Sequence, residues 1–366
     1  MLEVENIIAG GGICGLLLAR KLHQVYPNSE ICVLEKELYV GEHSSGRNSG
    51  VLHAGIYYPT NSKKHLLCIR GNQLWRELSK ELNFEIQNCG KYIIATSEDE
   101  KFQLKSIFQQ ALKNKVPGIR QIENSEIQEL AEHVKIVDGL FSGTTAVIDL
   151  SGSIKAIEND LFKKNIPVMV GHKIIDIKRH EEKFLISVAS PEGIIKILCK
   201  KIFNLAGLEA IKLRKLLGLN NLELKMVKGN YLKSTQKLFH KNLIYPIPKE
   251  DLKGLGIHTS FDISGVIRFG PNVEDIHHLN YKIAENLRAQ MFPEISKIFK
   301  NIDKDSLFPD YCGIRSKILL DNKLYPDFWI KNGADLGQFN YFEACGIESP
   351  GYTSAPAIAE AIVNML

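Results

Sequence analysis

A glycine-rich turn near the start of the chain constrains the fold more than any other feature. An apolar run, residues 7–9, leads into Gly10, Gly12 and Gly15, which have the GxGxxG spacing, and residues 16–22 then form an apolar helical segment. In a βαβ unit, the first glycine allows a tight turn, the second lets backbone approach a pyrophosphate, and the third lets the helix pack against the strand. The pattern predicts a dinucleotide-binding fold.

A carboxylate follows at the expected distance. A second apolar run, residues 31–34, ends at Glu35, about 20 residues after the glycines, where a carboxylate can accept hydrogen bonds from ribose hydroxyls. The helix N-terminus offers free N–H groups and a partial positive charge to the phosphates. The alternative is a glycine-rich turn without a ligand, and the turn alone does not distinguish NAD from FAD.

A long polar loop, residues 41–59, comes next. Loops of this length are uncommon inside a compact domain unless they have a function. Its serines, Arg47 and its backbone N–H groups can surround a pyrophosphate from the side opposite the first helix, while Gly50 and Gly55 allow the main chain to lie against a flat ring. The alternative is a mobile surface loop.

The remaining elements indicate an α/β chain with two interleaved domains, since 366 residues exceed one simple core. Short strands at 173–177, 184–188 and 194–198 predict a three-stranded meander, and a buried strand at 201–205 closes it. Residues 224–325 are β-rich, with strands that include 255–259 and helices near 283–291 and 292–300. We assign 1–90, 151–223 and 326–366 to a Rossmann-like nucleotide domain, and 91–150 and 224–325 to an antiparallel β-sheet substrate domain.

Composition excludes several classes of protein. Lys and Arg exceed Asp and Glu by only four, and the basic clusters lie at element ends, so we expect no nucleic-acid partner. The seven cysteines form no CxxC pair, which is typical of reduced thiols in a cytosolic protein without a metal site. No apolar run reaches membrane-spanning length. We expect a cytoplasmic protein, and peripheral contact with the inner membrane stays open.

Two features favour FAD over NAD. One is the loop at 41–58, and the other is Gly351-Tyr352-Thr353, which begins the last helix. A reduced flavin carries negative charge on its pyrimidine edge, and a helix N-terminus directed there stabilises it. A plain N-capped terminal helix is the alternative.

Several longer motifs carry a family resemblance. The chain resembles the flavoproteins of the D-amino-acid oxidase superfamily, and within it is most similar to the L-2-hydroxyglutarate dehydrogenase/oxidase family. The resemblance implies bound FAD, oxidation of an L-2-hydroxy acid to the 2-oxo acid, and electron transfer to a quinone or oxygen. The matching segments include residues 10–15, 35–36, 45–59, 228–231, 243–246, 256–259, 270–272 and 313–315.

The residues expected to contact FAD come from the turn, the loop, the meander and the last helix. They are Gly10, Gly12, Ile13, Gly15, Glu35, Lys36, Ser44, Ser45, Arg47, Asn48, Ser49, Gly50, Val51, His53, Ile174, Ala206, Gly207, Gly351, Tyr352 and Thr353.

Oxidation of a 2-hydroxy acid requires a base for the hydroxyl proton and a cation for the carboxylate. His53 is the candidate base, because an imidazole titrates near neutrality; a covalent flavin linkage or a structural role are its alternatives. Arg315 is the candidate carboxylate clamp, since a guanidinium binds carboxylates bidentately, although a surface salt bridge is the alternative. Tyr245 and His258 are weaker substrate-side candidates.

Other functions remain open at this stage. A flavin-dependent amino-acid or glycine oxidase and a glycerol-3-phosphate dehydrogenase would keep the flavin and change the substrate. A flavin-binding scaffold without turnover would change the class of protein, and an NAD-dependent dehydrogenase would be colourless when purified.

Overall fold

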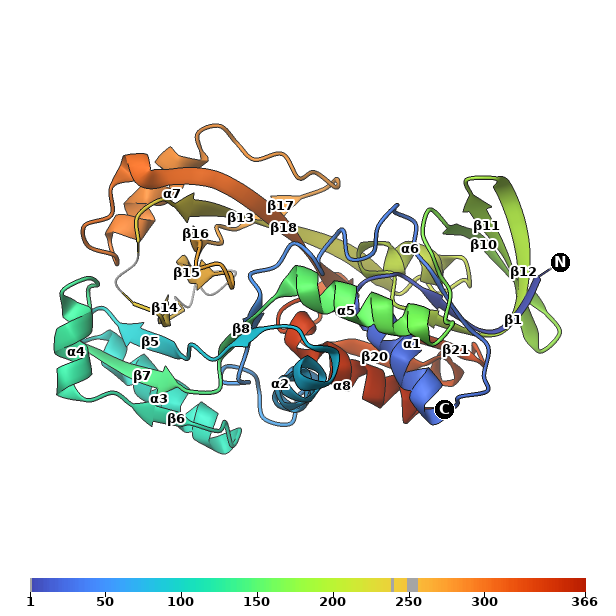
Figure 1. Cartoon of the computed structure of the whole chain (residues 1–366), viewed down its shortest axis with the longest axis horizontal. Coiled ribbons are helices and arrows are strands. Elements are labelled where there is room, and N and C mark those ends of the chain that lie inside the picture. The colour runs from blue at the N-terminus through green and yellow to red at the C-terminus, as the bar shows by residue number, and fades with distance from the viewer. Residues whose placement is uncertain (1, 238–239, 249–255) are drawn as a thin grey trace.

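The computed structural model describes residues 2–237, 240–248 and 256–366. It is a mixed α/β molecule in which an eight-stranded sheet and its helices lie at one end and three smaller sheets extend toward the other (Figure 1). Two long strands, β13 (Leu222–Ser234) and β18 (Leu307–Leu320), run from the middle of the molecule toward the second end.

The glycine turn lies in the expected βαβ unit, which consists of β1 (Leu2–Ala9), α1 (Ile13–Val25) and β2 (Ile31–Leu34). Strand β1 pairs in parallel with β2 on one side and with β12 (Gly193–Asn204) on the other. A Cβ on Gly15 would lie 2.0 Å from the Gly10 carbonyl oxygen, so only glycine lets α1 pack this close to the turn.

The meander is present, but the expected separate strands at 194–198 and 201–205 are wrong. They form one strand, β12, because its first part pairs with β11 and its second part, from Ile197 to Asn204, pairs with β1, so that the ladder continues without a break. On its other side, the first part of β12 pairs antiparallel with β11 (Lys183–Ser190), and its last residues pair in parallel with β21 (Tyr341–Cys345). Strand β10 (Lys173–His180) lies beyond β11 and pairs antiparallel with it. The other strands of this sheet are β9 (Val168–Met169) beside β2 and β20 (Trp329–Asn332) beside β21.

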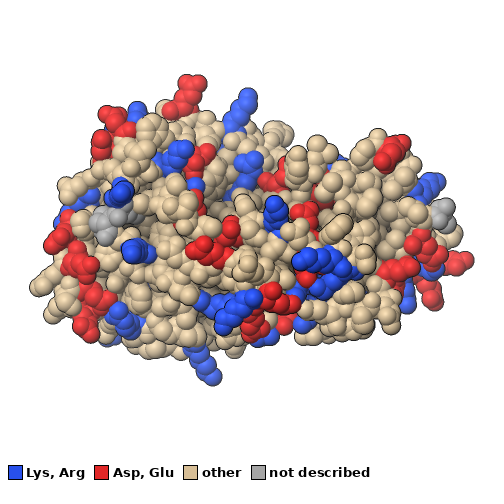
Figure 2. Space-filling view, in the orientation of Figure 1, with Lys and Arg blue, Asp and Glu red and all other residues tan. Residues whose placement is uncertain are grey.

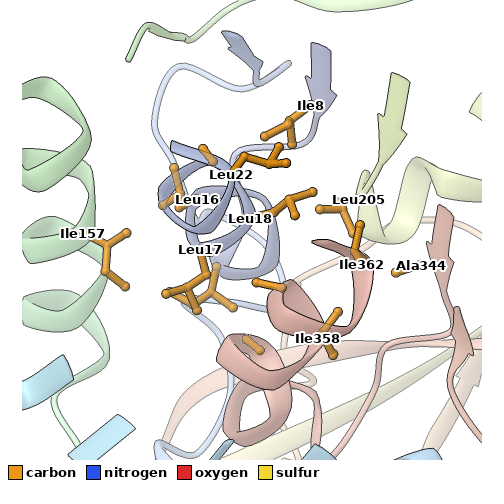
Figure 3. Close-up of a cluster of buried hydrophobic side chains, with 14 of the residues drawn as sticks. Ile8, Leu16, Leu17, Leu18, Leu22, Ile157, Leu205, Ala344, Ile358 and Ile362 are labelled. Atoms are coloured by element: carbon orange, nitrogen blue, oxygen red, sulfur yellow. The ribbon is translucent and has the colours of Figure 1, made fainter. Parts of the chain in front are cut away.

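The main core lies around α1. Its leucines are buried between Ile157 of α5 (Leu150–Lys163) and Ile358 and Ile362 of α8 (Gly351–Val363), as Figure 3 shows. A further helix, α2 (Lys63–Leu82), packs on α8 and contributes the buried Trp75. Burial of these apolar faces stabilises the βαβ unit, and it fixes the N-termini of α1 and α8 in the folded protein.

The smaller sheets pair strands that are distant in sequence. One has the order β15-β16-β13-β18-β19 with β17 beside β13, another β14-β5-β7-β6, and the third β3-β8-β4. The bounds are β3 (Val51–Leu52), β4 (Ile86–Gln87), β5 (Lys91–Ala95), β6 (Ile119–Gln121), β7 (Asp138–Ser142), β8 (Ala146–Ile148), β14 (Leu243–Pro246), β15 (His258–Phe261), β16 (Ile267–Gly270), β17 (Glu274–Ile276) and β19 (Lys323–Leu324). The remaining helices are α3 (Glu100–Lys113), α4 (Asn124–Ala131), α6 (Ala210–Lys215) and α7 (Leu287–Ser296).

Two further expectations change. The helices expected at 283–291 and 292–300 are one helix, α7, with Pro293 inside it, because Leu287, Met291 and Ile295 keep one buried face across the proline. The strand expected at 255–259 begins at His258, and Leu255 lies outside the described residues.

On the face shown in Figure 2, Lys and Arg side chains are interspersed with Asp and Glu. Within residues 2–237, 240–248 and 256–366, none of the helices has the length and apolar character needed to cross a bilayer.

Candidate active site

A cavity of about 470 Å³ lies where the βαβ unit meets the sheet of β13 and β18. Its walls come from the glycine turn, the end of β2, the loop at 41–53, the middle of β18 and the first turn of α8. Segments from both ends of the sequence therefore meet around one space.

The N-terminus of α1 forms part of this wall. Gly12 caps the helix without a side chain, and the N–H of Ile13 donates to Ser45 Oγ at 3.0 Å. A Cβ on Gly12 would meet Ser45 Oγ at 3.1 Å and no other described heavy atom within 4 Å. The backbone here is open toward the cavity, as a phosphate cradle at a helix N-terminus requires.

Glu35 holds the turn in place. One carboxylate oxygen accepts a hydrogen bond from the N–H of Gly11 at 2.7 Å, and the other accepts from the N–H of Glu37 at 2.8 Å. Each oxygen has a second lone pair, so contact with ribose hydroxyls stays available.

The loop at 41–50 folds back onto the turn. The N–H of Gly41 donates to the Gly11 carbonyl at 3.1 Å, and Asn48 Nδ2 donates to the carbonyl of Ser45 at 2.8 Å. Ser44 Oγ donates to the carbonyl of Ile314 in β18 at 2.9 Å. These bonds order the loop along the cavity, in contrast to the alternative of a mobile surface loop.

Tyr281 closes over this loop from another part of the chain. Its hydroxyl is 2.7 Å from His43 Nδ1, and its ring lies 4.2 Å from the guanidinium carbon of Arg47. Sequence reasoning missed His43 and Tyr281, because nothing near residue 281 indicates a partner some 240 positions earlier.

His53 lies at the other end of the cavity. The backbone N–H of His53 donates to Thr353 Oγ1 at 3.0 Å, and its backbone carbonyl accepts from Asn72 Nδ2 at 3.0 Å. Its Nε2 is 3.4 Å from Ser349 Oγ. The backbone of His53 is thus held by α2 and by the first turn of α8, and its ring lies beside Ser349, which precedes α8.

The surroundings keep this imidazole neutral. Burial, and then the charges of Lys91, His258 and Arg315, lower the pKa of His53 to about 3. The ring is therefore unprotonated at neutral pH, which a general base requires, but in the empty site its low pKa makes it a weak base.

Arg315 on β18 faces the same end of the cavity. Within the described residues, no carboxylate lies within ion-pair distance of its guanidinium. The nearby Glu348 is already bound, since it accepts from Lys64 Nζ at 3.0 Å and Lys317 Nζ at 3.1 Å. Although burial favours the neutral acid, Lys64, Lys317 and Arg315 hold the pKa of Glu348 below its ordinary value.

Tyr245 and His258 complete this end. Their rings stack with centroids 3.8 Å apart, and both line the cavity. His258 Nδ1 donates to the Gly256 carbonyl at 3.0 Å, which leaves Nε2 of the neutral ring as an acceptor. Burial lowers the pKa of His258 to about 3.

Of the residues expected from the sequence, Gly15 and Gly50 do not line the cavity, and the others do. Gly15 acts in packing, as described above, and Gly50 has a positive φ of 67° in the loop. Tyr352 lines the cavity, but its ring stacks on Trp75 and its hydroxyl is 2.8 Å from Ser153 Oγ. Cavity residues that sequence reasoning did not propose include His43, His172, Lys173, Lys212, Gly229, Tyr231, Pro271, Gly313, Ser316, Glu348 and Ser349.

These residues fit FAD. The cavity combines the Glu35 end for a ribose, the open N-terminus of α1 for a pyrophosphate, and the N-terminus of α8 beside His53 for the flavin ring. Gly12 leaves the space that a side chain would fill.

Comparisons with known proteins agree with this geometry. The family model described as DAO, FAD dependent oxidoreductase, matches residues 6–365. The mitochondrial L-2-hydroxyglutarate dehydrogenase of Arabidopsis thaliana is 29% identical over 408 residues, with 99% of this chain and 83% of that protein covered. The corresponding protein of Pongo abelii is 30% identical over 373 residues, with 98% and 86% covered.

Solved structures show the same fold. L-α-glycerophosphate oxidase from Mycoplasma pneumoniae with FAD bound has a TM-score of 0.88 at 24% identity, covering 100% of this chain and 95% of that one. Glycine oxidase from Geobacillus kaustophilus has a TM-score of 0.80 at 14% identity, with the same coverage. From its sequence and its fold, this chain belongs to the DAO family of FAD-dependent oxidoreductases.

Proposed function

We propose that this chain oxidises the CH–OH group of a small L-2-hydroxy acid, such as L-2-hydroxyglutarate, to the 2-oxo acid. The observation that carries the proposal is that two groups lie at one end of the FAD cavity: the guanidinium of Arg315, which has no carboxylate within ion-pair distance among the described residues, and the neutral imidazole of His53. The relatives named L-2-hydroxyglutarate dehydrogenase support this substrate class.

Each side chain has a distinct task in this reaction. Arg315 holds the substrate carboxylate, so that C2 is fixed relative to the flavin position. His53 Nε2 takes the hydroxyl proton, and the hydride on C2 leaves as the C–O double bond forms. FAD, when bound, supplies the hydride acceptor. A bound carboxylate offsets the charge of Arg315, which raises the pKa of His53 and makes it a stronger base when substrate is present.

A covalent link between His53 and the flavin is the second role open to this residue. Acid precipitation separates the two: release of all yellow colour into the supernatant supports the base, whereas colour in the pellet that is lost in His53→Ala indicates the link.

The visible spectrum is the first test of the whole proposal. We expect a yellow protein whose flavin is bleached under anaerobic conditions by L-2-hydroxyglutarate. Bleaching by glycine, other amino acids or glycerol-3-phosphate, and not by 2-hydroxy acids, would favour an oxidase or glycerol-3-phosphate dehydrogenase role. A flavin that no member of the panel bleaches would favour a scaffold, and a colourless protein that takes up no added FAD contradicts the cofactor assignment.

We propose that residues 91–150 and 224–325 form the substrate side, because Tyr245, His258 and Arg315 all come from them. We further propose a quinone or oxygen as the electron acceptor, and the cytoplasm or the surface of the inner membrane as the place of action. Reoxidation rates with oxygen and with a soluble quinone distinguish the two acceptors.

A further inference from the structure

The irregular segment between β17 and α7, residues 277–286, carries one aromatic side chain to the cofactor cavity, and we call this segment the strap. Most of its residues are exposed, whereas Tyr281 is half-buried. Two buried side chains hold its backbone: Cys312 Sγ of β18 donates to the carbonyl of Tyr281 at 3.2 Å, and Lys228 Nζ of β13 donates to that of Lys282 at 2.9 Å. The strap is thus fixed to the sheet of β13 and β18 at the point where Tyr281 leaves it.

The Tyr281 side chain contacts two residues of the loop at 41–50. Its hydroxyl is 2.7 Å from His43 Nδ1, and its ring lies 4.2 Å from the guanidinium carbon of Arg47. Its ring also stacks on that of His43, with centroids 5.9 Å apart. His43 and Arg47 line the cavity, and Tyr281 lies behind them. Tyr281 can therefore act on a bound cofactor only through these two residues.

A chain of hydrogen bonds continues from Tyr281 to the glycine turn. His43 Nε2 is 2.8 Å from Glu37 Oε1, and because a carboxylate only accepts, Nδ1 of the neutral ring is left to accept from the Tyr281 hydroxyl. Burial raises the pKa of Tyr281 to about 12, so this hydroxyl keeps its proton. The N–H of Glu37 donates to Glu35, which also accepts from Gly11. The strap is thus connected to the turn that faces the cofactor.

The loop at 41–50 is the wall of the cavity that can move most easily. It consists of turns and bends, and side-chain contacts hold it in place. Other walls come from β2 and β18, which are paired in sheets, and from α8, which is packed in the core. Segments of irregular structure open at a lower free energy than paired strands and buried helices. Entry and exit of a ligand as large as FAD require such an opening.

We propose that Tyr281 is a positioning residue of the cofactor site, which holds the loop at 41–50 closed against the strap and thereby limits the rates at which FAD enters and leaves. The inference goes beyond the proposed function, since it applies whatever substrate is oxidised. Opening of the loop breaks the contacts of Tyr281 with His43 and Arg47. Because the closed loop has these contacts with and without FAD, their loss speeds entry and exit alike and changes the dissociation constant little.

The test measures both rates of FAD exchange. Uptake is followed by the change in flavin fluorescence when FAD is mixed with apoprotein, and release by the free FAD that appears after holoprotein is diluted. Tyr281→Phe keeps the ring and loses the hydrogen bond, so we expect both rates to rise about 2- to 10-fold. Tyr281→Ala loses both contacts, and we expect a rise of about 10- to 100-fold. The dissociation constant should stay within about threefold of the wild-type value.

Two further comparisons accompany these rates. Tyr39 is 71% exposed and precedes the loop, outside the cavity wall, so Tyr39→Ala should keep both wild-type rates. In a His43→Ala background, Tyr281→Phe should add little, because the hydroxyl has lost its partner. A purely structural role would lower the melting temperature of the apoprotein and leave the rates of the folded protein unchanged. Tyr281→Phe removes a single oxygen and decides the matter if Tyr281→Ala does not fold.

The outcomes separate this inference from the proposed function. Wild-type rates in both Tyr281 variants overturn it. Faster release with unchanged uptake also overturns it, because Tyr281 would then stabilise the bound state alone. If acid precipitation leaves the flavin in the pellet, the same rates are measured in the His53→Ala background, which removes the link. Failure of every 2-hydroxy acid to bleach the flavin overturns the proposed function and leaves the role of Tyr281 standing.

Discussion

At the scale of single residues, the candidate chemistry depends on charge that the protein leaves unbalanced. Arg315 has no carboxylate partner in the described structure, and His53 is kept neutral by burial and by neighbouring cations. Arg315 is half-buried, and partial removal of a cation from water without a close counterion costs free energy, which a bound carboxylate would offset. The same arrangement that weakens the empty site thus favours a bound carboxylate.

Substitutions of Arg315 test the carboxylate clamp. Loss of a charge-assisted bond to a partly buried anion costs roughly 2 to 4 kcal/mol, which is about 30- to 1000-fold in kcat/KM for Arg315→Ala. Arg315→Lys keeps the charge without the planar fork and should lie between the two. The flavin spectrum should be the same in all three proteins.

Arg288→Ala on α7 is the matched control, because that arginine pairs with Asp305 outside the cavity. Equal kcat/KM for wild type, Arg315→Lys and Arg315→Ala would assign Arg315 a structural role.

The pH dependence of kcat/KM tests His53. The neutral imidazole is the active form, and its pKa of about 3 lies below the ordinary value of 6.5. We therefore expect kcat/KM to stay level from about pH 8 to about pH 5, and the acid limb of kcat to lie at higher pH than that of kcat/KM, because bound carboxylate offsets Arg315. An acid limb of kcat/KM centred near the ordinary histidine value is the contrary result.

At the scale of elements, two helix N-termini define the cavity, one from α1 and one from α8. The sequence predicts both helix N-termini, because a glycine before an apolar helical segment is a local pattern. It does not predict that the Tyr281 ring lies against Arg47, or that Lys91 lies against the Tyr245 ring, because these contacts join segments that are distant in sequence. The sequence also predicts two strands where the structure has the single strand β12. The charged pair Lys200-Lys201 resembles a turn, and the pairing of β12 with β1, which is distant in sequence, is what keeps the strand continuous.

Gly12 and Gly15 allow a comparison within one turn. Gly12→Val should fold and lose FAD, because the added side chain occupies the open space beside Ser45. Gly15→Val should not fold stably, since its Cβ would lie 2.0 Å from the Gly10 carbonyl oxygen. Thermal melts and visible spectra of the two variants distinguish these outcomes, and a yellow Gly12→Val protein contradicts the cradle.

At the scale of the whole molecule, interleaving brings segments from many parts of the sequence to one cavity, and two histidines in it affect how the stability of the protein depends on pH. Two imidazoles, the half-buried His53 and the buried His258, are neutral with pKa values of about 3. In the unfolded chain they titrate near 6.5, so below that value the unfolded state binds more protons than the folded state. Stability should therefore fall as pH drops below about 6.5.

The melting temperature of the apoprotein measures this effect. We expect it to be lower at about pH 5 than at about pH 7, and the difference to be smaller in His258→Gln, which removes one of the two titrating rings. A pH dependence unchanged in His258→Gln would mean that the ring is not buried neutral in solution.

The position of β21 and α8 in the sheet and core has a consequence for biosynthesis. Strand β21 pairs with β12, and α8 packs between α1 and α2, with Thr353 bonded to the backbone of His53. Translation proceeds from the N-terminus, so the βαβ unit emerges from the ribosome long before residues 341–363. A nascent chain can form the glycine turn early, but the cavity, whose wall includes the first turn of α8, closes only after those residues arrive. We therefore expect FAD to bind after the chain is complete, and a prematurely terminated chain lacking α8 would leave the apolar faces of α1 and α2 uncovered for recognition by chaperones and proteases.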